Sequence, residues 1–310
     1  MSDGKEAWVT SLSAVSAVAL WGLAFPLIQI GLEDFSPIML GFLRFVLASA
    51  LMLVFIVVMY SFEQVAATVR KEWKPLLILG LLYVTIPNIA QNIGLQSGTS
   101  SIASVIQSSG PVMTLIFAVL LLKERMTSMK AMGTVVAMAG TILLVASGGI
   151  SLQDEDFTSN VFILMSATSY GLAWVSAKRM LERNPPVLII GLSLMFGTAL
   201  LAVAVPFESP MVFEVNTDSV VNLLVLGLLC GSISSLLYLS SLEKHEVSRM
   251  AFFIYLMPVF ASVFAWILRG EGVETWTAVC GLIIVAGILI ANRNSGPATP
   301  KPATTGADHP

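Results

Sequence analysis

The chain has 310 residues, of which 56% are hydrophobic and only 11% are charged, and its mean hydropathy is +0.87. A soluble domain carries about 25% charged residues, so this composition excludes an ordinary soluble protein. The formal net charge of −3 points to no charged partner, because the charges are segregated along the chain.

Apolar runs long enough to cross a bilayer recur from one end of the chain to the other. A hydrocarbon core about 30 Å thick requires roughly 20 apolar residues per helix. The first run follows Lys5 as in a signal peptide, but it is long, lacks a small-residue cleavage site and opens an array of similar runs. We therefore predict an all-α integral membrane protein. Its ten transmembrane helices are expected at residues 12–31, 36–60, 75–96, 99–122, 128–148, 158–179, 186–207, 219–242, 247–268 and 274–292.

The basic residues predict the orientation. Fourteen of the 16 lysines and arginines lie at the termini or in alternate connections, all on one side of the predicted helices, whereas Arg269 lies on the other. By the positive-inside rule the basic side is cytoplasmic, so both termini are expected in the cytoplasm. The basic set is Lys5, Arg70, Lys71, Lys74, Lys123, Arg125, Lys130, Lys178, Arg179, Arg183, Lys244, Arg249, Arg293 and Lys301. The acidic set expected outside is Glu33, Asp34, Asp154, Glu155, Asp156, Glu208 and Glu214.

The two halves of the chain repeat each other. Residues 76–82 read LLILGLL and residues 223–229 read LLVLGLL, an offset of 147. Each half holds five predicted helices, an odd number, so residues 12–148 and 158–292 are expected to cross the membrane in opposite senses around a central cavity. Inverted repeats of this kind are typical of secondary transporters. The offset of 147 also pairs Pro111 with Pro258, Phe117 with Phe264, Glu124 with Glu271 and Gly140 with Gly287, and an offset of 149 pairs Gly22 with Gly171 and Glu33 with Glu182.

Several short motifs carry a family resemblance. They are Ala19-Leu20-Trp21-Gly22 followed by Phe25, Pro37 with Leu43-Arg44-Phe45, Ser109-Gly110-Pro111-Val112, and Leu122-Lys123-Glu124 followed by Gly133 and Ala139-Gly140. Over residues 10–293 the chain resembles an EamA-type member of the drug/metabolite transporter superfamily. The resemblance implies a five-plus-five inverted fold in a bacterial inner (plasma) membrane, and export of amino acids or related metabolites. The second half departs from the pattern at Arg269-Gly270-Glu271-Gly272, which has no lysine beside the acid.

The ends of the chain are expected outside the membrane. Residues 1–11 are interpreted as a cytoplasmic N-terminus. Residues 293–310, rich in Pro, Thr, Gly and Ala, are interpreted as a disordered cytoplasmic tail.

Polar residues cluster on the third predicted helix. Thr85, Asn88 and Asn92 share one face, with Gln91 adjacent and Pro87 able to bend the helix. The repeat carries each polar position to another one: Thr85 to Ser232, Asn88 to Ser235, Gln91 to Tyr238, Ser101 to Ser248 and Ser108 to Tyr255. A polar lining shared by both halves is what a central pathway requires, although hydrogen bonds between helices are the alternative.

Aromatic residues form a second candidate stripe. Trp21 and Phe25 lie one helical turn apart, as do Tyr170 and Trp174, and the repeat pairs Trp21 with Tyr170 and Phe25 with Trp174. Ordinary packing is the alternative. The remaining candidates for the substrate cavity are Tyr83, Ser104 and Phe252.

Three charged residues are assigned structural or gating roles. Arg44 lies about seven residues beyond Pro37, roughly 10 Å into an apolar run. Its alternative role is attraction of a carboxylate or phosphate group. Glu124 and Glu271 close equivalent helices and are expected to pair with neighbouring bases or helix ends. Gly133, Gly140, Gly281 and Gly287 predict close packing of the fifth and tenth helices.

Other functional classes lack their signatures. No Asp, Glu, His or Lys lies deep in a predicted helix, so proton coupling has no obvious carrier and facilitated diffusion or exchange is the simpler hypothesis. The sequence has no Gly-Lys-Ser phosphate loop, no candidate catalytic or metal cluster, no motif that calls for a cofactor and no nucleic-acid footprint.

The leading hypothesis is an exporter of small neutral or zwitterionic metabolites, with neutral or aromatic amino acids as the first class to test. The expected partners are a small-molecule substrate and the lipid bilayer; a monomer is plausible, and the sequence does not fix the oligomeric state. The alternatives are a carrier of nucleobases, sugars or phosphorylated compounds, and a membrane scaffold or sensor that does not transport.

Overall fold

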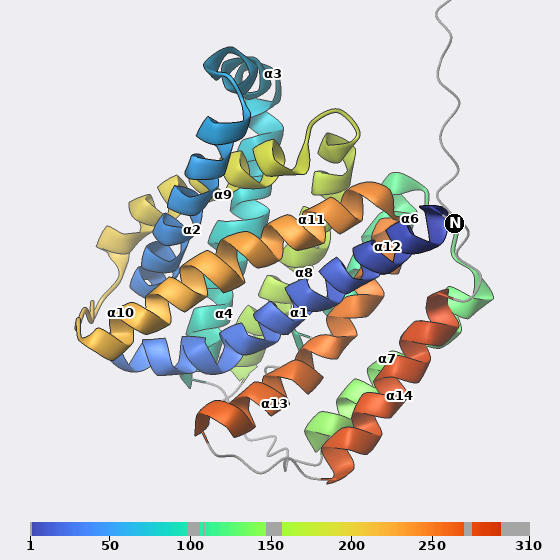
Figure 1. Cartoon of the computed structure of the whole chain (residues 1–310). Coiled ribbons are helices and arrows are strands. Elements are labelled where there is room, and N and C mark those ends of the chain that lie inside the picture. Colours follow the sequence, from blue (N-terminus) through green and yellow to red (C-terminus); the bar gives the residue numbers. More distant parts are fainter. Residues whose placement is uncertain (1, 98–105, 108, 147–156, 270–274, 293–310) are drawn as a thin grey trace, which may run out of the picture.

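A computed structural model describes residues 2–97, 106–107, 109–146, 157–269 and 275–292 (Figure 1). Within these ranges the regular structure is helical, and extended backbone pairs at a single isolated antiparallel bridge between Phe35 and Phe213. The prediction of an all-α protein is confirmed for the described residues.

The helices of the first half follow in chain order. They are α1 (Ser2–Asp34), α2 (Pro37–Met59), α3 (Phe62–Gly80), which continues through the π-helical segment η1 (Leu81–Thr85) into α4 (Ile86–Ser97), then α6 (Gly110–Leu122) and α7 (Ser128–Ala146).

The second half begins with α8 (Phe157–Leu181). It continues with α9 (Pro186–Ala204) and the 3-10 turn η3 (Val205–Phe207), then α10 (Thr217–Leu224), the π-helical segment η4 (Val225–Ile233) and α11 (Ser234–Lys244), then α12 (Val247–Ala251), the 3-10 segment η5 (Phe252–Leu256) and α13 (Met257–Arg269), and finally α14 (Thr275–Asn292).

Two helices begin earlier than apolarity alone predicts. Helix α1 starts at Ser2 rather than at residue 12, and α3 starts at Phe62 rather than at residue 75. The early part of α3 is charged on one side, and a reciprocal capping box fixes its start: Gln64 N donates to Ser61 Oγ at 3.3 Å, and Ser61 N donates to Gln64 Oε1 at 3.0 Å. A search for apolar runs does not register such a segment. Most of the start of the predicted helix 99–122 lies outside the described residues.

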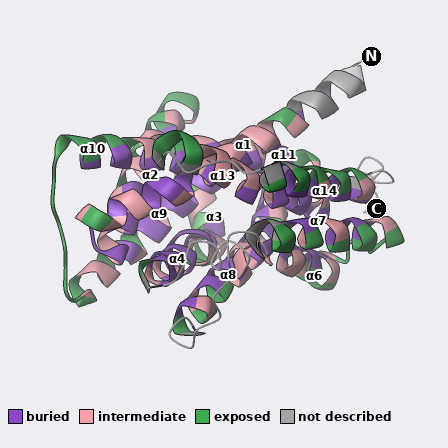
Figure 2. Cartoon of the chain, turned by 90° about the horizontal axis from the view of Figure 1, so that it is seen from below, coloured by how far each residue is buried: buried purple, intermediate pink, exposed green. Residues whose placement is uncertain are grey.

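Six described helical stretches are long and apolar enough to cross a membrane: Thr10–Asp34, Pro37–Met59, Phe62–Gln96, Pro186–Phe207, Thr217–Lys244 and Val247–Leu268. Large apolar side chains also cover the outside of the bundle; Val58 is 78% exposed and Leu282 is 71% exposed. Figure 2 shows exposed residues along the outward sides of α7 and α14 and buried residues between the helices. Apolar surface on this scale suits lipid rather than water.

Glycines allow two helix pairs to approach closely. Helices α7 and α14 lie side by side (Figure 1), and a Cβ atom added at Gly287 would lie 2.5 Å from the backbone nitrogen of Ala137. A Cβ added at Gly80, where α3 meets α9, would lie 2.7 Å from the backbone nitrogen of Gly197. No larger side chain fits at these positions without a shift of backbone, because the nearest atoms belong to the facing helix.

One end of the bundle gathers acidic residues. The carboxylate of Glu208 accepts hydrogen bonds from Ser36 Oγ at 2.6 Å and from the backbone nitrogens of Ile38 at 2.6 Å and Met39 at 2.9 Å. It therefore caps the start of α2, where the helix dipole favours a negative charge. We call this end, with Asp34 and Glu214 joined by a backbone hydrogen bond, the acidic end.

Candidate functional site

A cavity lies in the centre of the bundle, between α1, α2, η1, α4, α6, α8, η4 and α13. The space between its walls is about 690 Å³, counting the part that is open to solvent, which limits a ligand to small-molecule size. Its walls are mostly aromatic and apolar. The described aromatic lining is Trp21, Phe25, Phe45, Tyr83, Tyr170 and Trp174, and the described polar lining with longer side chains is Arg44, Gln91, Gln107 and Thr114.

Equivalent positions of the two halves face each other across this cavity. At the offset of 147, Tyr83 corresponds to Cys230, Gln107 to Ile254 and Gly110 to Met257, and both members of each pair line the cavity. At the offset of 149, Trp21 corresponds to Tyr170 and Phe25 to Trp174, and again both members line it. The cavity is thus built jointly by the two repeats.

Five of the predicted aromatic residues are in ring contact. Trp174 is central: its ring centroid lies 5.5 Å from that of Trp21, 4.9 Å from that of Tyr83 and 4.5 Å from that of Tyr238. Tyr170 joins the group at 5.8 Å from Tyr83. Contacts at 4.5–7 Å are favourable for aromatic pairs, so these rings form a continuous aromatic cluster on one wall.

Most of the predicted polar residues lie behind the wall rather than on it. Gln91 lines the cavity, whereas Asn88 Nδ2 donates to the carbonyl of Val84 at 2.7 Å and Asn92 Nδ2 donates to the carbonyl of Pro37 at 2.8 Å. Thr85 Oγ1 donates to the carbonyl of Gly197 at 3.2 Å, and Ser232 Oγ donates to the carbonyl of Ala48 at 2.7 Å. The hydrogen bonds of Asn92, Thr85 and Ser232 link neighbouring helices, whereas that of Asn88 lies within its own helical stretch.

The other predicted cavity residues fall into two groups. Ser235 shares a hydrogen bond of 2.5 Å with the hydroxyl of Tyr83, and Tyr238 is almost completely buried in the aromatic cluster. Phe252 and Tyr255 are almost completely buried in an apolar cluster with residues of α7 and α14. Ser104 and Ser108 lie outside the described residues, as does Glu271, which was predicted as a structural or gating charge. That any of these residues binds substrate stays a prediction.

Two features of the site escaped sequence reasoning. The π-helical segments η1 and η4 occupy equivalent places in the two halves and carry the lining residues Tyr83, Cys230 and Gly231. Such π segments are often found at functional sites, but no residue type marks them. Gln107 and Thr114 were also missed. They are seven residues apart in the sequence, a helical spacing that could have drawn attention to them.

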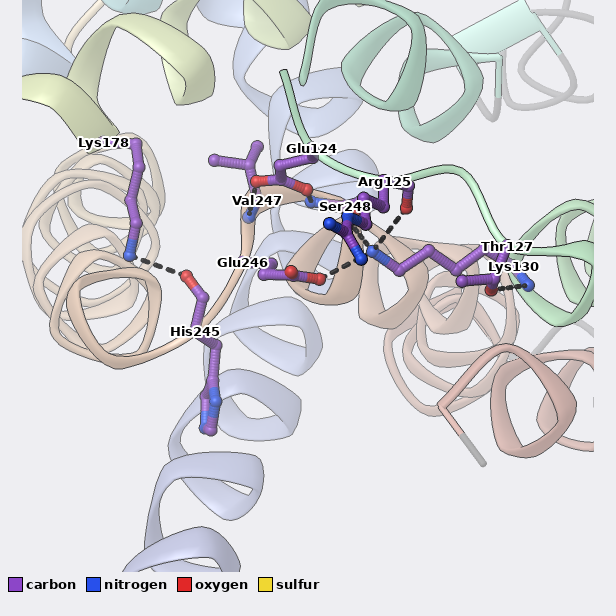
Figure 3. Close-up of polar contacts among 9 residues, drawn as sticks. All are labelled: Glu124, Arg125, Thr127, Lys130, Lys178, His245, Glu246, Val247 and Ser248. Carbon is purple, nitrogen blue, oxygen red and sulfur yellow. Dashed lines mark hydrogen bonds and ion pairs between the residues drawn. The ribbon is translucent and has the colours of Figure 1, made fainter. Parts of the chain in front are cut away.

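The opposite end of the bundle is tied together by charged side chains (Figure 3). The Glu124 carboxylate accepts hydrogen bonds from Val247 N at 2.8 Å and Ser248 N at 3.1 Å, and so caps the start of α12. Lys130 Nζ pairs with the Glu246 carboxylate at 2.6 Å and donates to Ser248 Oγ at 2.8 Å. We call this end the basic end.

Lys178 closes the end of α11 in the same region (Figure 3). Its Nζ donates to the carbonyl oxygens of Leu242 at 2.6 Å, Glu243 at 2.9 Å and His245 at 2.7 Å. The connection from α11 to α12 is therefore held by side chains from both halves. Partial burial, together with the nearby cations Arg249, Lys178 and Lys244, lowers the pKa of His245 below its ordinary value and so favours the neutral ring.

The aromatic cluster lies between the cavity and the basic end. Ser241 Oγ donates to the carbonyl of Thr10, which places the start of α1 beside the end of α11. Trp21 on α1 is therefore nearer to the basic end than the cavity residue Phe25. In the same way, Trp174 on α8 is nearer than Tyr170, and Tyr238 on α11 is nearer than Cys230. Trp21 and Trp174 therefore line the cavity on the side nearest to the basic end, with Tyr238 packed against them.

Comparisons with known proteins agree with these features. A model of the EamA-like transporter family matches residues 8–146 and 158–293. An uncharacterized transporter of Archaeoglobus fulgidus is 26% identical over 285 residues, covering 91% of this chain and 96% of its own. A probable terminal-alkyne amino-acid exporter of Streptantibioticus cattleyicolor is 23% identical, covering 95% of this chain and 96% of its own. A solved crystal structure that is 18% identical shares the fold, with a TM-score of 0.79 over 92% of this chain and 97% of the other.

Proposed function

Because the chain belongs to the EamA-like transporter family, we propose that it carries small neutral or zwitterionic metabolites across the membrane by alternating access. The observation that carries this proposal is the central cavity lined by equivalent positions of both repeats. A site shared by two repeats is what alternating access requires, since rocking of one half against the other exposes it to each side in turn.

The proposed architecture is ten transmembrane helices in two inverted repeats, residues 12–148 and 158–292, in the inner membrane with both termini in the cytoplasm. The two family matches, which divide the chain at almost the same places, support the repeat boundaries. The segregation of basic residues supports the orientation. With the basic end cytoplasmic, the aromatic cluster between the cavity and that end supports a state closed toward the cytoplasm.

The proposed substrates are neutral amino acids, aromatic ones first, and the proposed direction is export. Aromatic walls take an apolar side chain, and the amides of Gln91 and Gln107 supply hydrogen bonds. The amino-acid exporter among the relatives supports the same class.

The test is counterflow in proteoliposomes preloaded with unlabelled amino acids and supplied with labelled phenylalanine outside. We expect transient accumulation of label without an imposed proton gradient. Gln91→Ala should reduce the initial rate several-fold because its side chain lines the cavity, whereas Gln96→Ala, an exposed glutamine on the same helix, should leave it unchanged.

Other outcomes distinguish the alternatives. Accumulation that requires a proton gradient would refute uniport or exchange. Accumulation of nucleobases, sugars or phosphorylated compounds alone would move the substrate to those classes. An absence of flux for every solute tested, with a partner protein bound, would favour a scaffold or sensor.

A further inference from the structure

Within the described part of the chain, Arg44 is a buried cation without a counter-ion. The residue is 7% exposed and lines the cavity from α2. Its Nε has no hydrogen-bond partner, and neither ion pair found among the described residues includes it. Its one recorded contact of the cation–π kind is with the neighbouring ring of Phe45, whose centroid lies 5.1 Å from the guanidinium carbon. The described lining contains no aspartate or glutamate.

Such a charge is costly unless something neutralises it. Removing an ion from water carries a large desolvation penalty, and intramembrane charges are normally paired or face a water-filled path. The helix carbonyls do not serve here, because no hydrogen bond from Arg44 is recorded within the described part of the chain. The guanidinium instead faces the cavity, where a ligand can reach it.

The charge of the cavity favours one kind of anion. A guanidinium is planar, stays protonated and presents parallel donors that match a carboxylate or a phosphate. A phosphate brings up to two negative charges, and Arg44 is the single cation of the described lining. One carboxylate balances this charge, whereas a phosphate monoester would bring negative charge that the described lining does not neutralise.

The rest of the cavity can hold an ammonium group through uncharged partners. Gln107 Oε1 is a buried acceptor without a hydrogen-bond partner, and the ring faces of Trp21 and Tyr170 offer cation–π contacts. These groups can hold the ammonium group of a zwitterion. They do not offset the repulsion between Arg44 and a substrate that carries only positive charge. We propose that Arg44 is the carboxylate subsite of this transporter, so that its substrates are carboxylate-bearing metabolites, α-amino acids among them, and not cations, sugars or nucleobases. This inference refines the proposed function. It rests on that proposal for the transport of carboxylates, whereas the binding of carboxylates at Arg44 does not depend on it.

Binding of matched acid and amide pairs tests the subsite directly. Purified protein in detergent is titrated with phenylalanine and phenylalaninamide, and with 3-phenylpropionate and 3-phenylpropanamide, while the melting temperature is followed. We expect both acids to stabilise the protein and both amides to fail. In Arg44→Gln, the concentration of acid that gives half of the maximal increase in melting temperature should rise roughly ten- to hundredfold, as expected for loss of a charge-assisted hydrogen-bonded pair.

Two further variants complete the design. Arg44→Lys keeps the charge but not the paired donors, and should retain part of the preference for acids. Arg70→Gln removes an exposed arginine from the middle of α3 and should respond as the unsubstituted protein does. If Arg44→Gln does not fold, the acid and amide comparison in the unsubstituted protein, together with Arg44→Lys, still decides the question.

The proposal is overturned if amides stabilise the protein as well as acids do, if Arg44→Gln responds to acids like the unsubstituted protein, or if no carboxylate in the series stabilises it. Failure of the proposed transport function would give a different result. The acids would bind, and their binding would depend on Arg44, but counterflow would show no accumulation of any of them.

Discussion

Glu124 shows how one side chain can hold two distant segments together. It follows α6 in the chain, yet its carboxylate caps the start of α12 through two backbone nitrogens. We expect Glu124→Ala to destabilise the protein by about 1–3 kcal/mol, because the charge-assisted hydrogen bonds and the favourable interaction with the helix dipole are both lost. Thermal unfolding in detergent measures the change.

The matched control is Glu33→Ala, which removes an exposed carboxylate at the end of α1. It should melt within experimental error of the unsubstituted protein. Equal melting temperatures for Glu124→Ala and Glu33→Ala would mean that the cap contributes nothing to stability.

For single residues, the sequence predicted some positions around the cavity correctly but could not separate them from positions that face a neighbouring helix. The repeat pointed to Trp21, Tyr170 and Trp174, and the structure places all three around the cavity. It pointed equally to Asn88 and Asn92, whose hydrogen bonds instead run to helix carbonyls. A helical repeat of polar residues specifies a face, but whether that face meets a cavity or a neighbouring helix depends on packing that spacing alone does not reveal.

Helices α7 and α14 depend on the absence of side chains where they touch. Gly287→Ala would bring a Cβ to 2.5 Å from the Ala137 backbone nitrogen, so the helices must separate. We expect a loss of about 1–3 kcal/mol, typical of overpacking. Denaturant unfolding of the purified protein measures it.

Gly281 on the same helix provides the control. A Cβ there would meet Val259 side-chain atoms at 3.6 Å, an ordinary contact. Gly281→Ala should be neutral or stabilise the protein by up to about 1 kcal/mol, since alanine favours the helix. Similar losses for both substitutions would show that helix separation at Gly287 is not the cause.

Elements were predicted best where apolarity defines them. The predicted helix 36–60 corresponds to α2 (Pro37–Met59), and 158–179 corresponds to α8 (Phe157–Leu181). The charged start of α3 and the π-helical segments η1 and η4 were not predicted. The first depends on a cap, and the others depend on tertiary contacts around the cavity that local sequence does not encode.

At the scale of the whole molecule, the family predicted from short motifs is confirmed, because the family model matches both halves. The motifs sufficed because they recur in register with the repeat. The opposite orientation of the two halves rests on the parity of five predicted helices and on the placement of basic residues, and it stays a prediction.

Lys71 and Asp218 can decide the orientation. They are equivalent at the offset of 147, and both are exposed, Lys71 in the middle of α3 and Asp218 near the start of α10. If the repeats are inverted, Lys71→Cys should lie in the cytoplasm and Asp218→Cys outside. A membrane-impermeant maleimide applied to intact spheroplasts should therefore label Asp218→Cys at once and Lys71→Cys only after permeabilisation.

The native cysteines do not interfere with this test, because Cys230 and Cys280 are both buried; the unsubstituted protein serves as the blank. Labelling of both introduced cysteines from the same side would mean that the repeats are not inverted, and would overturn the proposed architecture. Labelling in the reverse order would keep the inverted repeats but place the capped basic end outside. The state described here would then be closed toward the exterior, and the same carrier would begin its cycle from the cytoplasm.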